Sequence, residues 1–168
     1  MTSSRNSALD RVDDAFCRIN GYAVGAMLFV MLALVFVNVV CRYFFFVSFG
    51  WIEEVSRYLM IWIVFLGAGL GLREGMHVAV TLFVDIAGPA RPYLMKAAWI
   101  GTFVFFAALG WYGYEYAMFA ARQRSTMLQL PMWTIYLAVP IGSLLTLIHM
   151  LLALRDTAKE TDIAEETA

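Results

Sequence analysis

The sequence predicts an all-α integral membrane protein with four transmembrane helices plus amphipathic interfacial helices. Of its 168 residues, 62% are hydrophobic and the mean hydropathy is +0.73, which exceeds the apolar content of ordinary soluble domains. Charge is also segregated, because Glu115 is the one charged residue that lies inside a long apolar run. A charge at the middle of a bilayer costs about 2.5–3.5 kcal/mol on insertion scales, so this segregation is typical of membrane-spanning segments.

The N-terminal part of the chain predicts a surface helix that leads into the first span. Residues 1–18 are polar, and from Ala8 onward the apolar residues fall on one helical face, which is typical of a cytoplasmic amphipathic helix on the membrane surface. The apolar run from Ile19 to Val40 has 22 residues. It is long enough to cross a bilayer and too long for the core of a signal peptide. The first span is therefore predicted at about residues 19–40.

The second span, at about residues 53–72, begins in a dense polar cluster. Its uncharged part, Tyr58 to Leu72, has 15 residues, about 22 Å of helix against a hydrocarbon core of about 30 Å. The helix is therefore expected to begin earlier, near Trp51. Both Glu53 and Glu54 are then placed to pair with Arg57 on neighbouring turns.

Small residues predict close packing between the first two spans. Gly21 and Gly25 open the first span, and Gly67 and Gly71 close the second at the same membrane face. Such small-x-x-x-small patterns let helix backbones approach closely. A dinucleotide-binding fingerprint is the alternative for the second pair, and the absence of a preceding strand argues against it.

Residues 73–92 are too polar to span a membrane and predict an interfacial helix at about residues 76–88. Glu74, His77, Thr81 and Asp85 form one stripe on it, with apolar residues on the rest of the surface. The pairs Gly88-Pro89 and Arg91-Pro92 are expected to end this helix. Its polar residues are candidates for contact with lipid or with a partner's cytoplasmic rim: Arg73, His77 and Asp85.

The third span is predicted at about residues 97–121 and the fourth at about 132–154. Pro131 is expected in the first turn of the fourth helix, where a missing backbone N–H is tolerated. Pro140 lies inside the span and predicts a kink there. Residues 155–168 carry a net charge of −3 and are predicted to form a disordered cytoplasmic tail.

Glu115 has two interpretations: an ion or proton site, or a carboxylate that reaches the headgroups or pairs with a nearby arginine. The second is favoured, because functional intramembrane acids usually lie deeper.

The distribution of basic residues predicts that both termini are cytoplasmic. With the N-terminus inside, eight basic residues lie in cytoplasmic segments: Arg5, Arg11, Arg18, Arg73, Arg91, Lys96, Arg155 and Lys159. Four lie in outer segments: Arg42, Arg57, Arg122 and Arg124. This bias follows the positive-inside rule.

The sequence favours a protein that is not an enzyme and that holds no metal or cofactor. Cys17 and Cys41 are 24 residues apart across one predicted helix, about 36 Å, which excludes a disulfide between them. His77 and His149 leave open a haem-carrying or structural anchor of a respiratory complex, although His77 lies outside its span. A small stand-alone carrier is a further alternative, and the absence of an acid in the first helix and of paired broken helices argues against it. Nothing in the sequence indicates nucleic-acid binding.

Several short motifs occur in a characteristic order. They are Asn38-x-x-x-Arg42-Tyr43, Trp51-x-Glu53-Glu54-x-x-Arg57-Tyr58, Phe65-Leu66-Gly67-Ala68, Arg73-x-Gly75-x-His77-Val78-x-Val80, Leu130-Pro131-x-Trp133 and Pro140-Ile141-Gly142. In this order and spacing, from about Asp13 to His149, the chain resembles the small membrane subunit (DctQ-type) of tripartite ATP-independent periplasmic (TRAP) transporters. The acidic residue in Val84-Asp85 falls later than in that pattern.

The resemblance implies a non-catalytic subunit in the bacterial inner membrane. It implies two partners: a periplasmic solute-binding protein that captures an organic anion, and a large subunit that carries the solute and sodium sites. The small subunit would brace the large one and help form the docking surface. Candidate contacts with these partners are Arg42, Trp51, Glu53, Glu54, Arg57, Tyr58 and Trp133.

Overall fold

The chain is built from four long helices, described by a computed structural model that covers the backbone of residues 8–87 and 91–166 and the side chains of residues 11, 13–72, 93–94 and 96–153. The long helices are α1 (Ala8–Phe44), α2 (Gly50–Ala87), α3 (Arg91–Phe119) and α5 (Ala138–Glu166). Two short elements, η2 (Ala120–Arg122) and α4 (Trp133–Tyr136), lie between α3 and α5. The predicted all-α fold is confirmed.

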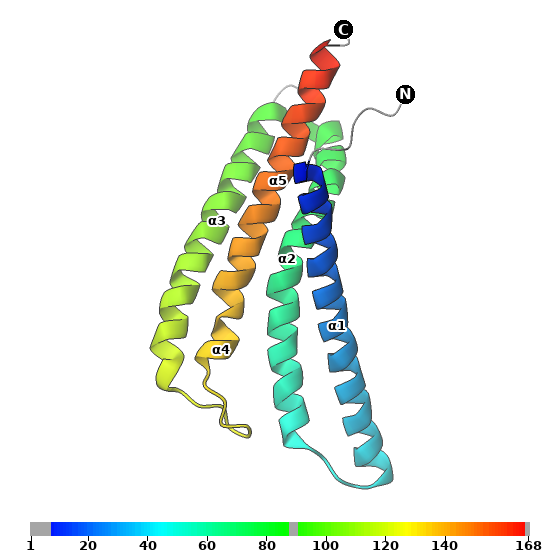
Figure 1. Cartoon of the computed structure of the whole chain (residues 1–168), viewed down its shortest axis with the longest axis vertical. Coiled ribbons are helices and arrows are strands. Elements are labelled where there is room, and N and C mark those ends of the chain that lie inside the picture. The colour runs from blue at the N-terminus through cyan, green and yellow to red at the C-terminus, as the bar shows by residue number, and fades with distance from the viewer. Residues whose placement is uncertain (1–7, 88–90, 167–168) are drawn as a thin grey trace.

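The four long helices lie side by side in the order α3, α5, α2, α1 (Figure 1). The main contacts are between α2 and α5, between α1 and α2, and between α3 and α5. Helices α1 and α3 therefore form the two edges of the row, and α2 and α5 form its middle.

Within the described residues, four segments are long and apolar enough to cross a membrane, as predicted. They are Asp13–Phe44, Gly50–Leu72, Lys96–Arg122 and Trp133–Ala153. Each segment contains a most apolar stretch of 18 residues. The buried share of that stretch is 39% in the fourth segment, 11% in the second, and zero in the first and third. The edge helices α1 and α3 thus expose apolar side chains on the outer surface of the row.

The polar segments at the helix ends extend the spans instead of forming separate elements. Residues 8–18 continue into the first span within α1, and the polar segment after the second span continues α2 to Ala87. Helix α5 likewise runs to Glu166, so residues 155–166 are helical where the sequence predicts a disordered tail. The physical reason is that these segments contain no proline, and a change from apolar to polar side chains alone does not end a helix.

The predicted irregularity near Pro140 is present one turn earlier. Leu137 separates α4 from α5, and its N–H still bonds to the carbonyl of Trp133 at 2.9 Å. Pro140 has no N–H to bond to the carbonyl of Tyr136, four residues before it. The missing bond accounts for the break between the two helices.

Glycines permit the close approach of α5 to its neighbours, although not the glycines that the sequence motif indicates. A Cβ added to Gly142 would lie 2.5 Å from the carbonyl oxygen of Phe65, and one added to Gly69 would lie 2.7 Å from His149 Cδ2. By contrast, a Cβ on Gly21, Gly25 or Gly71 would meet no atom within 4 Å, and one on Gly67 would make an ordinary 3.9 Å contact with Val24. Of these four glycines, Gly67 alone would contact the other span among the described residues, and their role in helix packing stays a prediction. Their spacing is equally compatible with an open helix surface.

Candidate partner-binding surface

Two connections lie at the same end of the row. Residues 45–49 join α1 to α2, and residues 123–132 join η2 to α4 (Figure 1). We call this the hairpin end, because residues 123–132 form a compact hairpin, and we call the other end, which holds both termini, the terminal end.

The 123–132 hairpin is ordered by its own backbone. Arg124 and Pro131 form an antiparallel bridge, the N–H of Ser125 donates to Leu130 O at 2.9 Å, and the N–H of Met132 donates to Gln123 O at 3.0 Å. The Ser125 hydroxyl also accepts the N–H of Leu130 at 3.1 Å. This connection is thus a defined turn rather than an open loop.

Glu54 attaches the hairpin to α2. Its Oε2 accepts the backbone N–H groups of Met127 at 3.0 Å and Leu128 at 3.1 Å. Its Oε1 accepts the Tyr58 hydroxyl from the next turn of the same helix. The side chain is only 3% exposed. A buried carboxylate with three donors is a strong tether, because hydrogen bonds to a charged group are stronger than those between neutral groups.

A second polar contact fixes the connection between α1 and α2. Asn38, which is buried near the end of α1, accepts the N–H of Phe49 through its side-chain oxygen at 3.0 Å. Ile52 is 3% exposed in the first turns of α2. A Cβ on Gly50 would lie 2.9 Å from Met127 Cε, so the hairpin also packs directly over the start of α2. Both connections at this end are therefore held against the helices.

The structure divides the predicted partner-contact residues into two groups. Glu54 and Tyr58 are engaged inside the chain, so the structure gives them a part in anchoring the hairpin. Exposed side chains remain on the surface of this end: Arg42, Trp51, Glu53, Arg57 and Trp133. On α2, Glu53 and Arg57 lie about 100° around the helix from Glu54 and Tyr58, because each residue turns the helix by about 100°. The two pairs therefore lie on different sides of α2: Glu54 and Tyr58 face the hairpin, and Glu53 and Arg57 are exposed.

Glu115 is exposed on α3. Among the described residues, no ion pair within 4 Å joins it to Arg122 or Arg124. The Arg124 guanidinium instead donates to Gln129 O at 3.3 Å. The interpretation of Glu115 as a headgroup-facing carboxylate stays a prediction.

A buried polar cluster lies toward the terminal end, between α1, α2 and α5. Asn20 Nδ2 donates to Leu66 O at 3.0 Å and lies 3.3 Å from His149 Nε2. Cys17 Sγ lies 3.8 Å from His149 Nδ1 and 3.8 Å from an oxygen of Asp13. Asn20 and His149 are 6% and 1% exposed. These contacts tie three helices together in the part of the bundle where α1 approaches α5.

Both ring nitrogens of His149 have a polar neighbour in the cluster. A carbonyl oxygen can only accept, so the contact with Leu66 O identifies the Asn20 nitrogen and its two donors. The 3.3 Å contact between this nitrogen and His149 Nε2 is within hydrogen-bond distance, and its direction depends on the tautomer of the imidazole ring. The ring also packs against Phe16, with centroids 4.7 Å apart. A ring whose two nitrogens face Asn20 and Cys17 does not fit the haem-ligating alternative.

The other candidates at the terminal end lie outside the described side chains. Arg73, His77 and Asp85 are on the part of α2 for which only the backbone is described. Among the described residues, no group of three or more His, Cys, Asp or Glu side chains is placed to hold a metal ion. No disulfide joins Cys17 to Cys41, both of which are among the described residues.

Two features of this arrangement escaped the sequence analysis. The tether from Glu54 to the hairpin spans 73 residues to Met127 and uses backbone donors, so no residue pattern marks it. The polar cluster does have a signal: Asp13, Cys17 and Asn20 are spaced i, i+4, i+7 and therefore share one face of α1. A polar stripe that enters an apolar helix indicates a buried polar contact, and this stripe could have been recognised.

Comparison with known proteins adds a family match. Residues 31–160 match the family model described as the DctQ component of tripartite ATP-independent periplasmic transporters. The matched range includes all four candidate spans in whole or in part, and it contains both Glu54 and the hairpin.

Curated relatives agree with this match. The chain is 45% identical over 71 residues, or 42% of its length, to a TRAP transporter small permease protein of Haemophilus influenzae. It is 29% identical over 100 residues (58% of the chain) to the C4-dicarboxylate TRAP transporter small permease protein DctQ of Rhodobacter capsulatus. The DctQ protein of the same description from Vibrio cholerae is 30% identical over 91 residues, or 54% of the chain. The matched segments cover 44%, 44% and 39% of these relatives, so they span less than half of each.

Proposed function

Because this chain belongs to the DctQ family of small membrane subunits of TRAP transporters, we propose that it braces the large transport subunit of a sodium-coupled solute importer and helps dock a periplasmic solute-binding protein. The family is a transporter membrane subunit and not an enzyme. The proposal therefore concerns partners and their placement rather than a reaction.

The single-row arrangement of the helices is the observation that supports a bracing role. In the described parts of the chain, α1 and α3 are edge helices whose most apolar windows have no buried residues. In the described part of the chain the helices form a row, and α1, α2 and α5 pack together only around Asn20 and His149. Apolar faces of this extent suit either lipid or another membrane subunit, and a transport path is then expected in the other subunit.

The hairpin end supports the docking role. Glu54 and Asn38 hold the two connections in place, so the exposed residues beside them stand on an ordered surface. A pre-ordered surface loses less conformational entropy when a partner binds. Aromatic and arginine side chains contribute most to protein contacts, and Trp51, Arg57 and Trp133 are of these types.

The proposal also gives the surroundings and the solute class. Both termini would be cytoplasmic, in a bacterial inner membrane, which places the hairpin end on the periplasmic side, as the excess of basic residues at the terminal end favours. The names of two relatives include C4-dicarboxylate, so a small organic acid is the solute class to test first.

Variants at the hairpin end test the proposal in a transport assay. Trp51→Ala and Arg57→Ala are expected to lower solute uptake and the recovery of the complex, while the sodium concentration for half-maximal uptake stays unchanged. Arg122→Ala is the matched control, since Arg122 is an exposed arginine at the same end that is not among the proposed contacts. A shifted sodium dependence in Trp51→Ala or Arg57→Ala would contradict the proposed division of roles between the subunits.

A further inference from the structure

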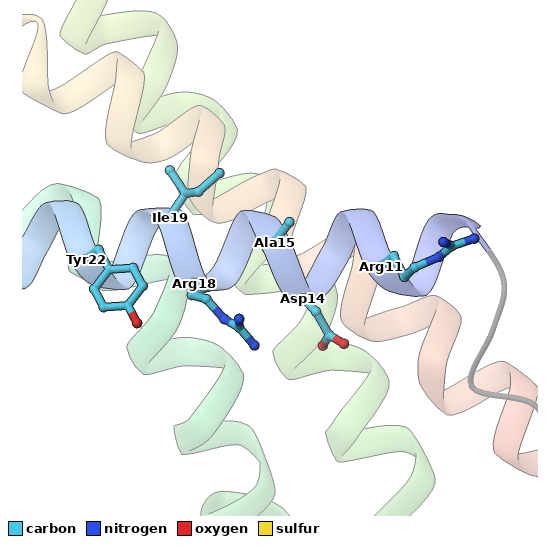
Figure 2. Close-up of a pocket in the computed structure, with 6 residues that line it drawn as sticks. All are labelled: Arg11, Asp14, Ala15, Arg18, Ile19 and Tyr22. Atoms are coloured by element: carbon cyan, nitrogen blue, oxygen red, sulfur yellow. The ribbon is translucent and has the colours of Figure 1, made fainter.

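A shallow depression lies on the surface of α1 near the terminal end (Figure 2). It has a volume of about 400 Å³ and is lined by Arg11, Asp14, Ala15, Arg18, Ile19 and Tyr22. All six residues belong to one face of one helix. The depression is separate from the buried cluster of Asn20 and His149 and from the hairpin end.

The charged groups of the depression are available to a ligand. Arg11 and Arg18 are both exposed and lie two helical turns apart, about 10.5 Å along the axis. Within the described side chains, no ion pair within 4 Å joins either guanidinium to Asp14. Asp13, the residue before Asp14, is only 7% exposed and lies 3.8 Å from Cys17 Sγ on another side of the helix. The lining residues thus carry two positive charges and one negative charge.

The sequence around the depression places it at the depth expected for lipid headgroups. Arg18 is the last charged residue before the 22-residue apolar run that starts at Ile19, so it marks the boundary of the hydrocarbon core. Below it, Ile19 and Tyr22 are 69% and 73% exposed and offer an apolar and aromatic surface. Tyrosine at this depth is typical of the membrane interface.

From this arrangement we propose that Arg11 and Arg18 bind the phosphate of an anionic membrane phospholipid, with Ile19 and Tyr22 against the upper part of its acyl chains. Arginine presents several N–H donors in a planar fork that matches phosphate oxygens. An anionic lipid supplies a negative charge that the two arginines do not find in an ion pair among the described side chains, and its acyl chains continue along the exposed apolar side of α1. Asp14 opposes the phosphate and so limits the affinity. The inference does not depend on the proposed transport function.

The test is the retention of phosphatidylglycerol by the full chain in nanodiscs of phosphatidylcholine, measured by the immobilised fraction of a spin-labelled phosphatidylglycerol. An arginine near a charged lipid surface changes binding by about fivefold. Arg11→Gln and Arg18→Gln are each expected to weaken the preference for phosphatidylglycerol by about that factor, and more when combined. Asp14→Asn is expected to strengthen it, which a loss of folding could not do.

Two controls keep the test specific. Arg122→Gln removes one positive charge at the hairpin end, where the side chain is also exposed, and should leave the preference of the Arg11 and Arg18 site unchanged. Arg11→Lys combined with Arg18→Lys keeps the charge and should retain most of the binding. Equal phosphatidylglycerol preference in the wild type and the double glutamine variant would overturn the proposal. A wild type that shows no preference for phosphatidylglycerol over phosphatidylcholine would overturn it as well, and would leave a protein partner as the occupant.

Discussion

The contact between Gly142 and Phe65 offers the sharpest test of how α2 and α5 pack. The perturbation is Gly142→Ala, which adds one methyl group. That methyl carbon would lie 2.5 Å from Phe65 Cβ, 2.5 Å from Phe65 O and 2.7 Å from Phe65 C. Non-bonded carbon atoms prefer about 3.5–4.0 Å, so the two helices must separate by about 1 Å.

The cost of this separation can be estimated. Inserting a methyl group into a packed core costs about 1–3 kcal/mol, and the upper end applies here because two of the three clashing atoms are backbone and cannot rotate away. Alanine favours a helix over glycine by about 1 kcal/mol, which offsets part of the cost. The net loss in the free energy of unfolding is then about 2 kcal/mol, about a thirtyfold change in the folding equilibrium constant.

Gly71→Ala is the matched control on the facing helix. A Cβ at Gly71 meets nothing within 4 Å, so this variant gains helix propensity without a clash and should be as stable as the wild type or more stable. Both variants are measured as full chains in mild detergent, by titration with a denaturing detergent while helicity is followed by circular dichroism. Equal stability of the Gly142→Ala and Gly71→Ala variants would refute the close approach of α2 and α5.

Three further predictions concern the hairpin, the polar cluster and the orientation. Glu54→Ala should speed hydrogen exchange of the two hairpin amides that it binds by about tenfold or more, whereas Glu53→Ala should not, and equal exchange in both variants would argue against the tether. Alanine substitutions of Asn20 and His149 should show a coupling energy of about 0.5–3 kcal/mol in a double-mutant cycle, since their side chains lie 3.3 Å apart; additive effects would exclude the contact. Phe46→Cys, at a position that is 90% exposed, should react with a membrane-impermeant maleimide from the periplasmic side in a chain without its native cysteines, and labelling only after the membrane is opened would reverse the proposed orientation.

The spans were predictable because hydropathy and charge act locally along the chain. A run such as Ile19 to Val40 predicts a membrane helix whatever its neighbours are, and Pro140 predicts an irregularity because its missing N–H is a property of the residue itself. Helix ends were less predictable. The polar C-terminal segment was expected to be disordered from its charge, whereas nothing in its sequence breaks the helix, and α5 runs to Glu166.

Contacts between distant segments were not predictable from the same reasoning. Glu54 was expected to pair with Arg57 on its own helix, and it bonds instead to backbone donors of the hairpin, which carry no side-chain signature. The glycine motifs likewise carry only local information. Their spacing shows that Gly21 and Gly25 share a helix face, and it does not show whether that face meets a helix of this chain.

The most direct test of the central claim is a mild-detergent pull-down of the tagged full chain from its native membrane, with mass spectrometry and an absorption spectrum of the product. A small TRAP subunit that braces a large one predicts recovery of a large polytopic membrane protein, reduced in the Trp51→Ala and Arg57→Ala variants and retained in Arg122→Ala. Recovery of the chain without such a protein, or together with respiratory subunits and a haem band, would contradict the proposed role.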